Sequence, residues 1–115
     1  PKNPANEWLV ANHYKQFKNP PDFFTAGGMS AAIAVVEALK KTQGDTATNK
    51  LITTMEGMSF DTPKGKMTFR KEDHQAMQSM YHFKIKADPA FAWGVPELVR
   101  EIKPEEMNIP IRNKR

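Results

Sequence analysis

The adjacent residues Asp73 and His74 are the pair in this sequence that comes nearest to catalytic machinery. A carboxylate beside an imidazole can activate a nucleophile through general base catalysis. Adjacent residues point to opposite faces of a strand and do not face each other on a helix, so a dyad here requires a loop. No Gly-x-Ser-x-Gly motif accompanies the pair. The sequence therefore favours a structural loop histidine, and a small α+β hydrolase using His74 and Asp73 is the alternative function.

Metal and phosphate chemistry lack the residues that they need. No two of His13, His74 and His82 lie three or four residues apart, which is the spacing of two ligands on one helix face, and the chain has no cysteine. Segment 63–66, Pro-Lys-Gly-Lys, lacks the upstream glycine and the following Ser or Thr of a phosphate-binding loop. It is interpreted as a hairpin turn. We expect no metal, no cofactor and no catalytic residue.

Segment 25–30, Thr-Ala-Gly-Gly-Met-Ser, is the best candidate for a binding site. The aromatic run at 22–26 favours a strand and the residues from Met29 onward favour a helix, so the glycines are predicted in a strand-to-helix loop. Small residues let a backbone approach a ligand, and free N–H groups at a helix start favour an anion such as a carboxylate. A tight turn that needs glycine for its geometry explains the pattern equally well, and spacing alone leaves both explanations open.

The basic character of the chain is concentrated at its C-terminal end. There are 17 Lys and Arg residues against 13 Asp and Glu residues, a net charge of +4. Arg112, Lys114 and Arg115 lie among the last four residues, and the rest of the chain is nearly neutral. A nucleic-acid-binding face would interleave cations with aromatic residues, which this sequence does not do. Nucleic acid is therefore not an expected partner, and a nucleic-acid-binding module that uses the tail is the weakest alternative.

With 115 residues, the chain is long enough for one domain at most. Its longest apolar run, 31–36, ends at Glu37, well short of the ~18 to 20 residues that cross a bilayer, so no membrane span is predicted. The first residues include no apolar signal segment and no initiator methionine. We therefore expect a mature piece or a portion of a longer protein.

Helical and extended patterns follow one another along the chain. Apolar residues at three- to four-residue spacing, with breakers at the ends, predict helices, and alternating or aromatic runs predict strands. The predicted helices cover 4–17, about 29–41, a stretch between Thr48 and Gly57, and 96–103. The predicted strands cover 22–26, 59–60, 66–69 and 79–86.

The motifs in these elements occur in a recognisable order. They read Asn-Pro-Ala-Asn-Glu-Trp at 3–8, Pro-Asp-Phe-Phe at 21–24, Gly-Gly-Met-Ser-Ala-Ala at 27–32, Met-Glu-Gly at 55–57, Phe-Asp-Thr-Pro-Lys-Gly-Lys-Met-Thr-Phe at 60–69 and Asp-His-Gln-Ala at 73–76. This order resembles the C-terminal part of the branched-chain amino acid-type (leucine/isoleucine/valine-binding-like) substrate-binding proteins of ABC importers. The resemblance covers residues 1 to about 86, and 57–69 is its most specific part.

The resemblance implies an α/β fold class. The chain would be the C-terminal portion, roughly the final third, of a two-lobed type I periplasmic binding protein with three-layer α/β/α lobes, and it would be incomplete as a stand-alone fold. Residues 1–75 would be the C-terminal part of lobe I. Residues 76–115 would hold the last crossover between the lobes, a strand of lobe II and the C-terminal tail. The crossover that acts as a hinge would consist of Ala76, Met77, Gln78, Ser79 and Met80.

The resemblance also implies a function that is not enzymatic. The whole protein would capture a small amino acid or an organic or aromatic acid in a cleft between the lobes and deliver it to an ABC permease in the membrane. It would be periplasmic, with a signal peptide that is not in this chain. The ligand-binding positions that carry over are Ala26, Gly27, Gly28 and Met29. Relatives often have Gly-Tyr-Asp-Ala where residues 28–31 of this chain read Gly-Met-Ser-Ala.

The portion that the chain lacks is itself an expected partner. A sheet without its other strands has unpaired edges and an uncovered apolar face. The resemblance therefore implies that the missing N-terminal part of the same protein completes this piece. A homo-oligomer formed by swapping of the fragment would cover the same surfaces.

Overall fold

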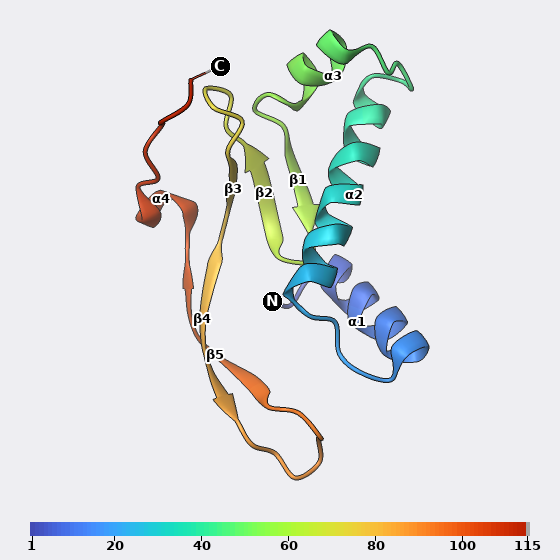
Figure 1. Ribbon diagram of the computed structural model, residues 1–115, viewed down its shortest axis with the longest axis vertical. Helices are drawn as coiled ribbons and strands as arrows, with labels where there is room; N and C mark the ends of the chain where they lie inside the picture. The colour runs from blue at the N-terminus through green and yellow to red at the C-terminus, as the bar shows by residue number, and fades with distance from the viewer. Residues whose placement is uncertain (115) are drawn as a thin grey trace. The chain divides into compact units, whose positions relative to one another are not determined.

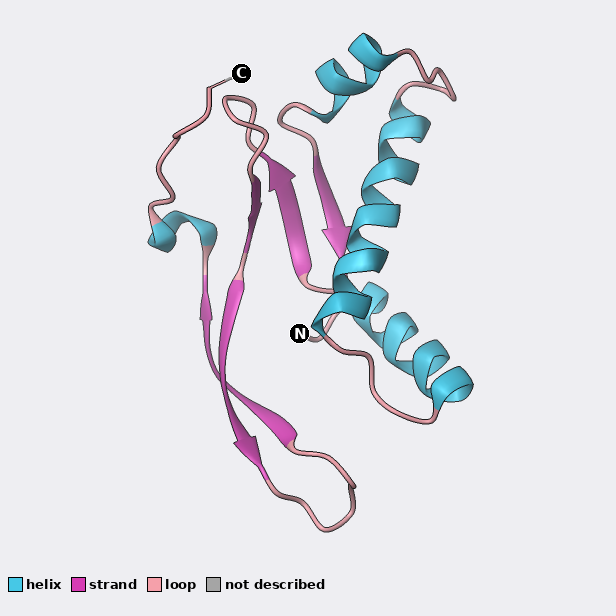
Figure 2. Cartoon of the chain, viewed as in Figure 1, coloured by secondary structure: helices cyan, strands magenta, loops and turns pink. Residues whose placement is uncertain are grey.

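A computed structural model describes residues 1–114, and the chain divides into two compact units. The first unit consists of Pro1–Gln78 together with the tail from Ile111 onward, and the second consists of Ser79–Pro110. Figure 1 labels the helices and strands in chain order, and Figure 2 distinguishes them by type. In the first unit they are α1 (Pro4–Phe17), α2 (Phe23–Lys41), α3 (Thr48–Met55), β1 (Ser59–Thr62), β2 (Gly65–Phe69) and β3 (Ala76–Gln78). In the second unit they are β4 (Met80–Lys86), β5 (Val95–Ile102) and α4 (Pro104–Met107).

The core of the first unit lies between α2 and an antiparallel sheet with strand order β1-β2-β3. Figure 1 shows α2 running alongside β1. The sheet register places Phe60 opposite Met67 and Thr68 opposite Met77. The buried residues of this core cluster come from α2, from β1 and the residue before it, and from β2: Ala34, Ala38, Met58, Phe60 and Met67.

Helix α1 has the bounds that the sequence predicts, 4–17. The side-chain oxygen of Asn3 accepts a hydrogen bond of 2.8 Å from the N–H of Asn6, and Pro4 occupies the first turn. Asn3 also donates from Nδ2 to the carbonyl oxygen of Pro63 at 3.3 Å. The residue that starts α1 therefore also ties this helix to the turn between β1 and β2.

The strand predicted at 22–26 is wrong, because α2 already begins at Phe23. Asp22 caps the helix: its Oδ1 accepts hydrogen bonds from the N–H of Thr25 at 2.7 Å and from the hydroxyl of Thr25 at 2.8 Å. The backbone bond first, and the hydroxyl bond after it, hold the pKa of the Asp22 carboxyl below its usual value. A satisfied cap outweighs the weak strand preference of two phenylalanines.

Helix α2 is long and apolar enough to meet a length and composition test for a membrane span, although the sequence predicts none. Core helices of soluble proteins pass the same test. Ala34 and Ala38 of α2 lie in the core against the sheet, and Lys40 and Lys41 occupy its last turn. We therefore assign α2 to the packing of the first unit.

The predicted hairpin is confirmed, with strands longer than expected and a turn of two residues, Pro63 and Lys64. Thr62 precedes the turn and is 1% exposed. Its hydroxyl donates to the carbonyl oxygen of Gly65 at 2.8 Å and accepts from the N–H of Lys64 at 3.1 Å. The Pro-Lys-Gly-Lys segment is therefore part of a hairpin turn, as the sequence predicts.

In the second unit, β4 confirms the strand predicted at 79–86, but the helix predicted at 96–103 is wrong. Residues 95–102 form β5, which pairs antiparallel with β4 and places Phe83 opposite Leu98. The apolar spacing of Val95, Leu98, Val99 and Ile102 also fits a helix, so periodicity did not decide between the two. β-branched residues and cross-strand partners favour the strand.

We predict that Gly57→Ala destabilises the protein by about 1 kcal/mol, because Gly57 has a φ of +74° that a side chain with a Cβ adopts with strain. The N–H of Gly57 donates to the carbonyl oxygen of Phe69 at 2.8 Å, which holds this conformation in place. Gly57→Asn should lower the free energy of unfolding by about half as much, since asparagine tolerates a positive φ better than alanine does. Chemical denaturation measures both variants, and an alanine variant as stable as the wild type would contradict the argument.

Candidate functional site

Asp73 and His74, the catalytic alternative from the sequence, do not face each other in the structure. The carboxylate of Asp73 instead accepts two hydrogen bonds from Arg70, from Nε at 2.8 Å and from Nη2 at 2.6 Å. The N–H of Gln75 adds a third at 3.2 Å. Arg70 holds the pKa of the Asp73 carboxyl below its usual value. Asp73 therefore organises its own loop and does not orient an imidazole.

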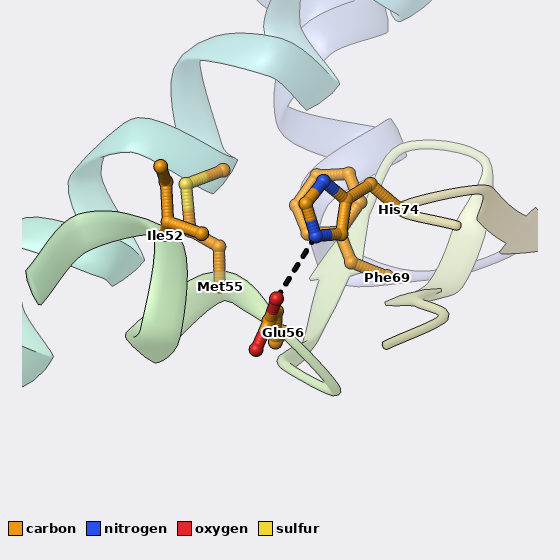
Figure 3. A pocket seen from close by; sticks show the side chains of 5 residues that line it. All are labelled: Ile52, Met55, Glu56, Phe69 and His74. Atoms are coloured by element: carbon orange, nitrogen blue, oxygen red, sulfur yellow. Dashed lines mark hydrogen bonds and ion pairs between the residues drawn. The ribbon is translucent and has the colours of Figure 1, made fainter. Parts of the chain in front are cut away.

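His74 turns toward the end of α3 (Figure 3). Its Nε2 lies 3.0 Å from Oε1 of Glu56. The backbone of His74 has a φ of +60°, and its N–H donates to the carbonyl oxygen of Arg70 at 2.8 Å. The N–H of Arg70 donates in turn to the carbonyl oxygen of Gln75 at 2.8 Å. His74 thus joins the loop between β2 and β3 to the residue that follows α3.

A cavity of about 150 Å³ lies beside this pair and is lined by Ile52, Met55, Glu56, Phe69 and His74. Its lining includes no serine, threonine, cysteine or lysine that could act as a nucleophile. Within residues 1–114, no group of three or more His, Asp or Glu residues could hold a metal ion. The geometry therefore gives the hydrolase alternative no support.

The four residues predicted to bind ligand, Ala26, Gly27, Gly28 and Met29, lie inside α2 and not in a loop before it. The N–H of Ala26 already donates to the carbonyl oxygen of Asp22 at 3.1 Å. These positions therefore do not present the free N–H groups of a helix start, as the sequence suggested. They do not form a tight turn either, because neither glycine has a positive φ.

The two glycines leave a bare patch on α2. Gly28 is exposed and Gly27 is half-buried, and a Cβ built on either one meets no atom within 4 Å apart from its chain neighbours and the nearby backbone of the helix itself. Glycine inside a helix costs about 1 kcal/mol relative to alanine. Packing within the described residues therefore does not explain why these two positions lack side chains.

Lys64 and Phe23 connect the start of α2 to the β1–β2 turn. The Nζ of Lys64 lies 5.0 Å from the centre of the Phe23 ring, a distance typical of a cation–π contact. Neighbouring Phe24 is 82% exposed. The first turn of α2 is thus held from one side while an aromatic ring beside it stays exposed.

The five predicted hinge residues lie where the chain passes from one sheet to the other. Ala76, Met77 and Gln78 form β3 and pair with β2, whereas Met80 begins β4 and pairs with Ile102 of β5. Ser79 belongs to neither strand. The structure also reveals two contacts that sequence reasoning missed, from Glu56 to His74 and from Arg70 to Asp73. Only the second had a sequence signal, the three-residue spacing of two opposite charges.

We predict that His74→Ala and Glu56→Ala each lower stability, and that a double-mutant cycle gives a coupling free energy of about 0.5–1 kcal/mol. The side chains are 38% and 23% exposed, so solvent screens the pair only in part. Thermal denaturation of the four proteins measures the coupling. Additive effects of the two substitutions would show that the contact contributes nothing.

Comparison with known proteins identifies the family. The family model for periplasmic binding proteins matches residues 1–90. A solved ABC-type branched-chain amino acid transporter protein from Rhodopseudomonas palustris CGA009 is 71% identical over 100% of this chain, with a TM-score of 0.92. No curated protein matches the sequence.

Two further solved structures are more distant. A solute-binding protein of an ABC transporter from Rhodopseudomonas palustris BisB5, in complex with 3,4-dihydroxybenzoic acid, is 27% identical over 89% of this chain and 28% of its own, with a TM-score of 0.79. A leucine-, isoleucine-, valine-, threonine- and alanine-binding protein from Brucella ovis shares the fold, with a TM-score of 0.74 and 20% identity over 96% of this chain and 31% of its own.

The chain spans 31% of the length of the CGA009 protein. The matches confirm the resemblance to branched-chain amino acid-type substrate-binding proteins. They also confirm the α/β fold class, and this chain corresponds to a portion of such a fold. On the family match over residues 1–90 of its 115 residues, the chain belongs to the periplasmic binding protein family.

Proposed function

We propose that the full-length protein is the extracytoplasmic solute-binding component of an ABC importer. The observation that carries this proposal is the 71% identity, over the whole chain, to an ABC-type branched-chain amino acid transporter protein. The similar solved proteins are named for transport and solute binding, so the proposal requires no catalytic residue and no cofactor. The periplasm is the proposed location, and a membrane permease of the ABC type is the proposed partner.

The proposed ligand is a small carboxylic acid, either an amino acid or an aromatic acid. The 27% identical relative holds 3,4-dihydroxybenzoic acid. The 71% identical relative is named for branched-chain amino acid transport. Both ligand classes combine a carboxylate with an apolar body, and a cleft that closes around such a molecule can recognise both parts.

The proposed mechanism is closure of two lobes around the ligand, which shifts the protein from open to closed states. Residues 1–75 would belong to lobe I, and residues 76–115 would contain the last crossover and part of lobe II. The residues proposed as the hinge are Ala76 to Met80. This assignment is supported by the change of strand partner at Ser79, since a residue outside both ladders can change its φ and ψ at little cost.

The bare patch at Gly27 and Gly28 supports the proposed ligand contact at these two residues and at Ala26 and Met29, which flank them. A helix face without side chains admits a ligand close to its backbone. Because nothing within the described residues fills the space above the glycines, the approaching group would come from outside them. We propose that the ligand occupies this space when the cleft is closed.

Apolar side chains exposed in the first unit support the missing part of the same protein as a partner. Phe23 is 65% exposed and Val35 is 56% exposed. Each is a large apolar residue that a complete lobe would be expected to cover. For a chain of 115 residues alone, exchange of elements between copies would cover the same surfaces.

We predict that the full-length protein binds at least one acid from a panel of branched-chain amino acids and hydroxybenzoates with micromolar or tighter affinity. The 115-residue chain alone should bind none of them, or bind only weakly, since most of the cleft would lie outside it. Isothermal titration calorimetry measures both proteins. Micromolar binding by the short chain would contradict the two-lobe mechanism, and no binding by the full-length protein would contradict the ligand class.

We further predict that Gly27→Ala and Gly28→Ala each stabilise the ligand-free full-length protein by about 1 kcal/mol, through helix propensity, and weaken its affinity for the acid identified above about tenfold or more. Gly44→Ala is the matched control at the other end of α2. It should lower stability, because Gly44 has a φ of +84°, and leave the affinity unchanged. Unchanged affinity in both test variants would contradict the proposal that Gly27 and Gly28 lie in the ligand site.

A further inference from the structure

The side chain of Gln78 has a buried acceptor with no partner. Gln78 is the last residue of β3, and its backbone lies opposite Met67 of β2. Its Oε1 atom is buried and has no hydrogen-bond partner among residues 1–114. Within that part of the chain, it is the one buried side-chain nitrogen or oxygen of this kind.

A buried carbonyl oxygen without a donor is unusual in a native protein. Most buried polar side-chain atoms have at least one partner, and leaving one unpaired forfeits the hydrogen bonds it had in water. Solvent does not compensate here, because the atom itself is not accessible. Only a hydrogen-bond donor from outside the described residues would satisfy this oxygen.

The place of Gln78 in the sheet indicates where that donor lies. The sheet order is β1-β2-β3, so β3 is an edge strand whose second side has no strand partner among the described residues. The chain spans 31% of the length of its 71% identical relative, so more than half of a comparable protein lies outside it. A donor on that portion is the source that both observations favour.

We propose that Oε1 of Gln78 accepts a hydrogen bond from an N–H or O–H group in the part of the full-length protein that this chain does not include. The contact fixes the end of β3 against that part, at the residue from which the chain passes into its second unit. It is a contact within the protein, and it holds whichever solute the protein binds.

Replacing Gln78 in the full-length protein tests this contact. Gln78→Leu and Gln78→Met remove the acceptor at similar size and leave the donor unpaired, so each should lower the Tm of the ligand-free protein by about 2 °C or more. If the oxygen has no partner, the same substitutions remove the free-energy cost of burying an unpaired polar atom and raise the Tm. Gln75→Leu is the matched control, since Gln75 is exposed in the preceding loop and should change the Tm little.

Two further outcomes would overturn the proposal. A weaker Kd for solute with an unchanged ligand-free Tm would place the donor on the ligand, and an unchanged Tm and Kd would leave the oxygen without a role. Should both apolar variants fail to fold, a crystal structure of the wild-type full-length protein decides the matter. It must show a donor from outside residues 1–115 within hydrogen-bonding distance of Oε1.

Discussion

The packing of α2 against β1 and β2 is the interaction on which the first unit depends. Ala34 and Ala38 lie four residues apart and so face the sheet together, where their small side chains allow the helix to approach Phe60 and Met67 closely. This contact determines which face of α2 is covered and which is not. Val35 and Val36, on the helix surface turned away from that contact, are about half exposed. Val35 and Val36 are therefore exposed because the opposite side of α2, with Ala34 and Ala38, packs against the sheet.

The contacts at the start of α2 limit how Gly27 and Gly28 could take part in ligand binding. Asp22 caps α2 and Lys64 lies over Phe23, and the N–H groups of Thr25 and Ala26 are both engaged by Asp22. Under the proposed function, Gly27 and Gly28 would contribute through the side chains they lack and not through unusual backbone angles. The four predicted positions therefore stay a proposal for a ligand contact, and anion binding by free N–H groups at a helix start does not support them.

Local signals predicted much of the fold. Asn3 and Pro4 mark the start of α1, and the breakers between Thr62 and Gly65 mark the hairpin, because capping and turn geometry are decided within a few residues. The failures at 22–26 and 96–103 have a different cause. In the first, side-chain caps from Asp22 override strand propensity, and in the second, an antiparallel partner selects a strand from a pattern that also suits a helix.

The candidate site was predictable only in part, for a reason that is also physical. The resemblance supplied the positions on α2, but contacts such as Glu56 with His74 join residues that are 18 apart, and only the folded backbone brings them together. The change of strand partner at Ser79 is also visible only in the folded chain. β3 has three residues and few ladder hydrogen bonds, whereas β4 pairs along its whole length. A residue outside both ladders, after a strand of only three residues, can change its φ and ψ at little cost. A hinge between two lobes would therefore be expected where the paired structure is thinnest.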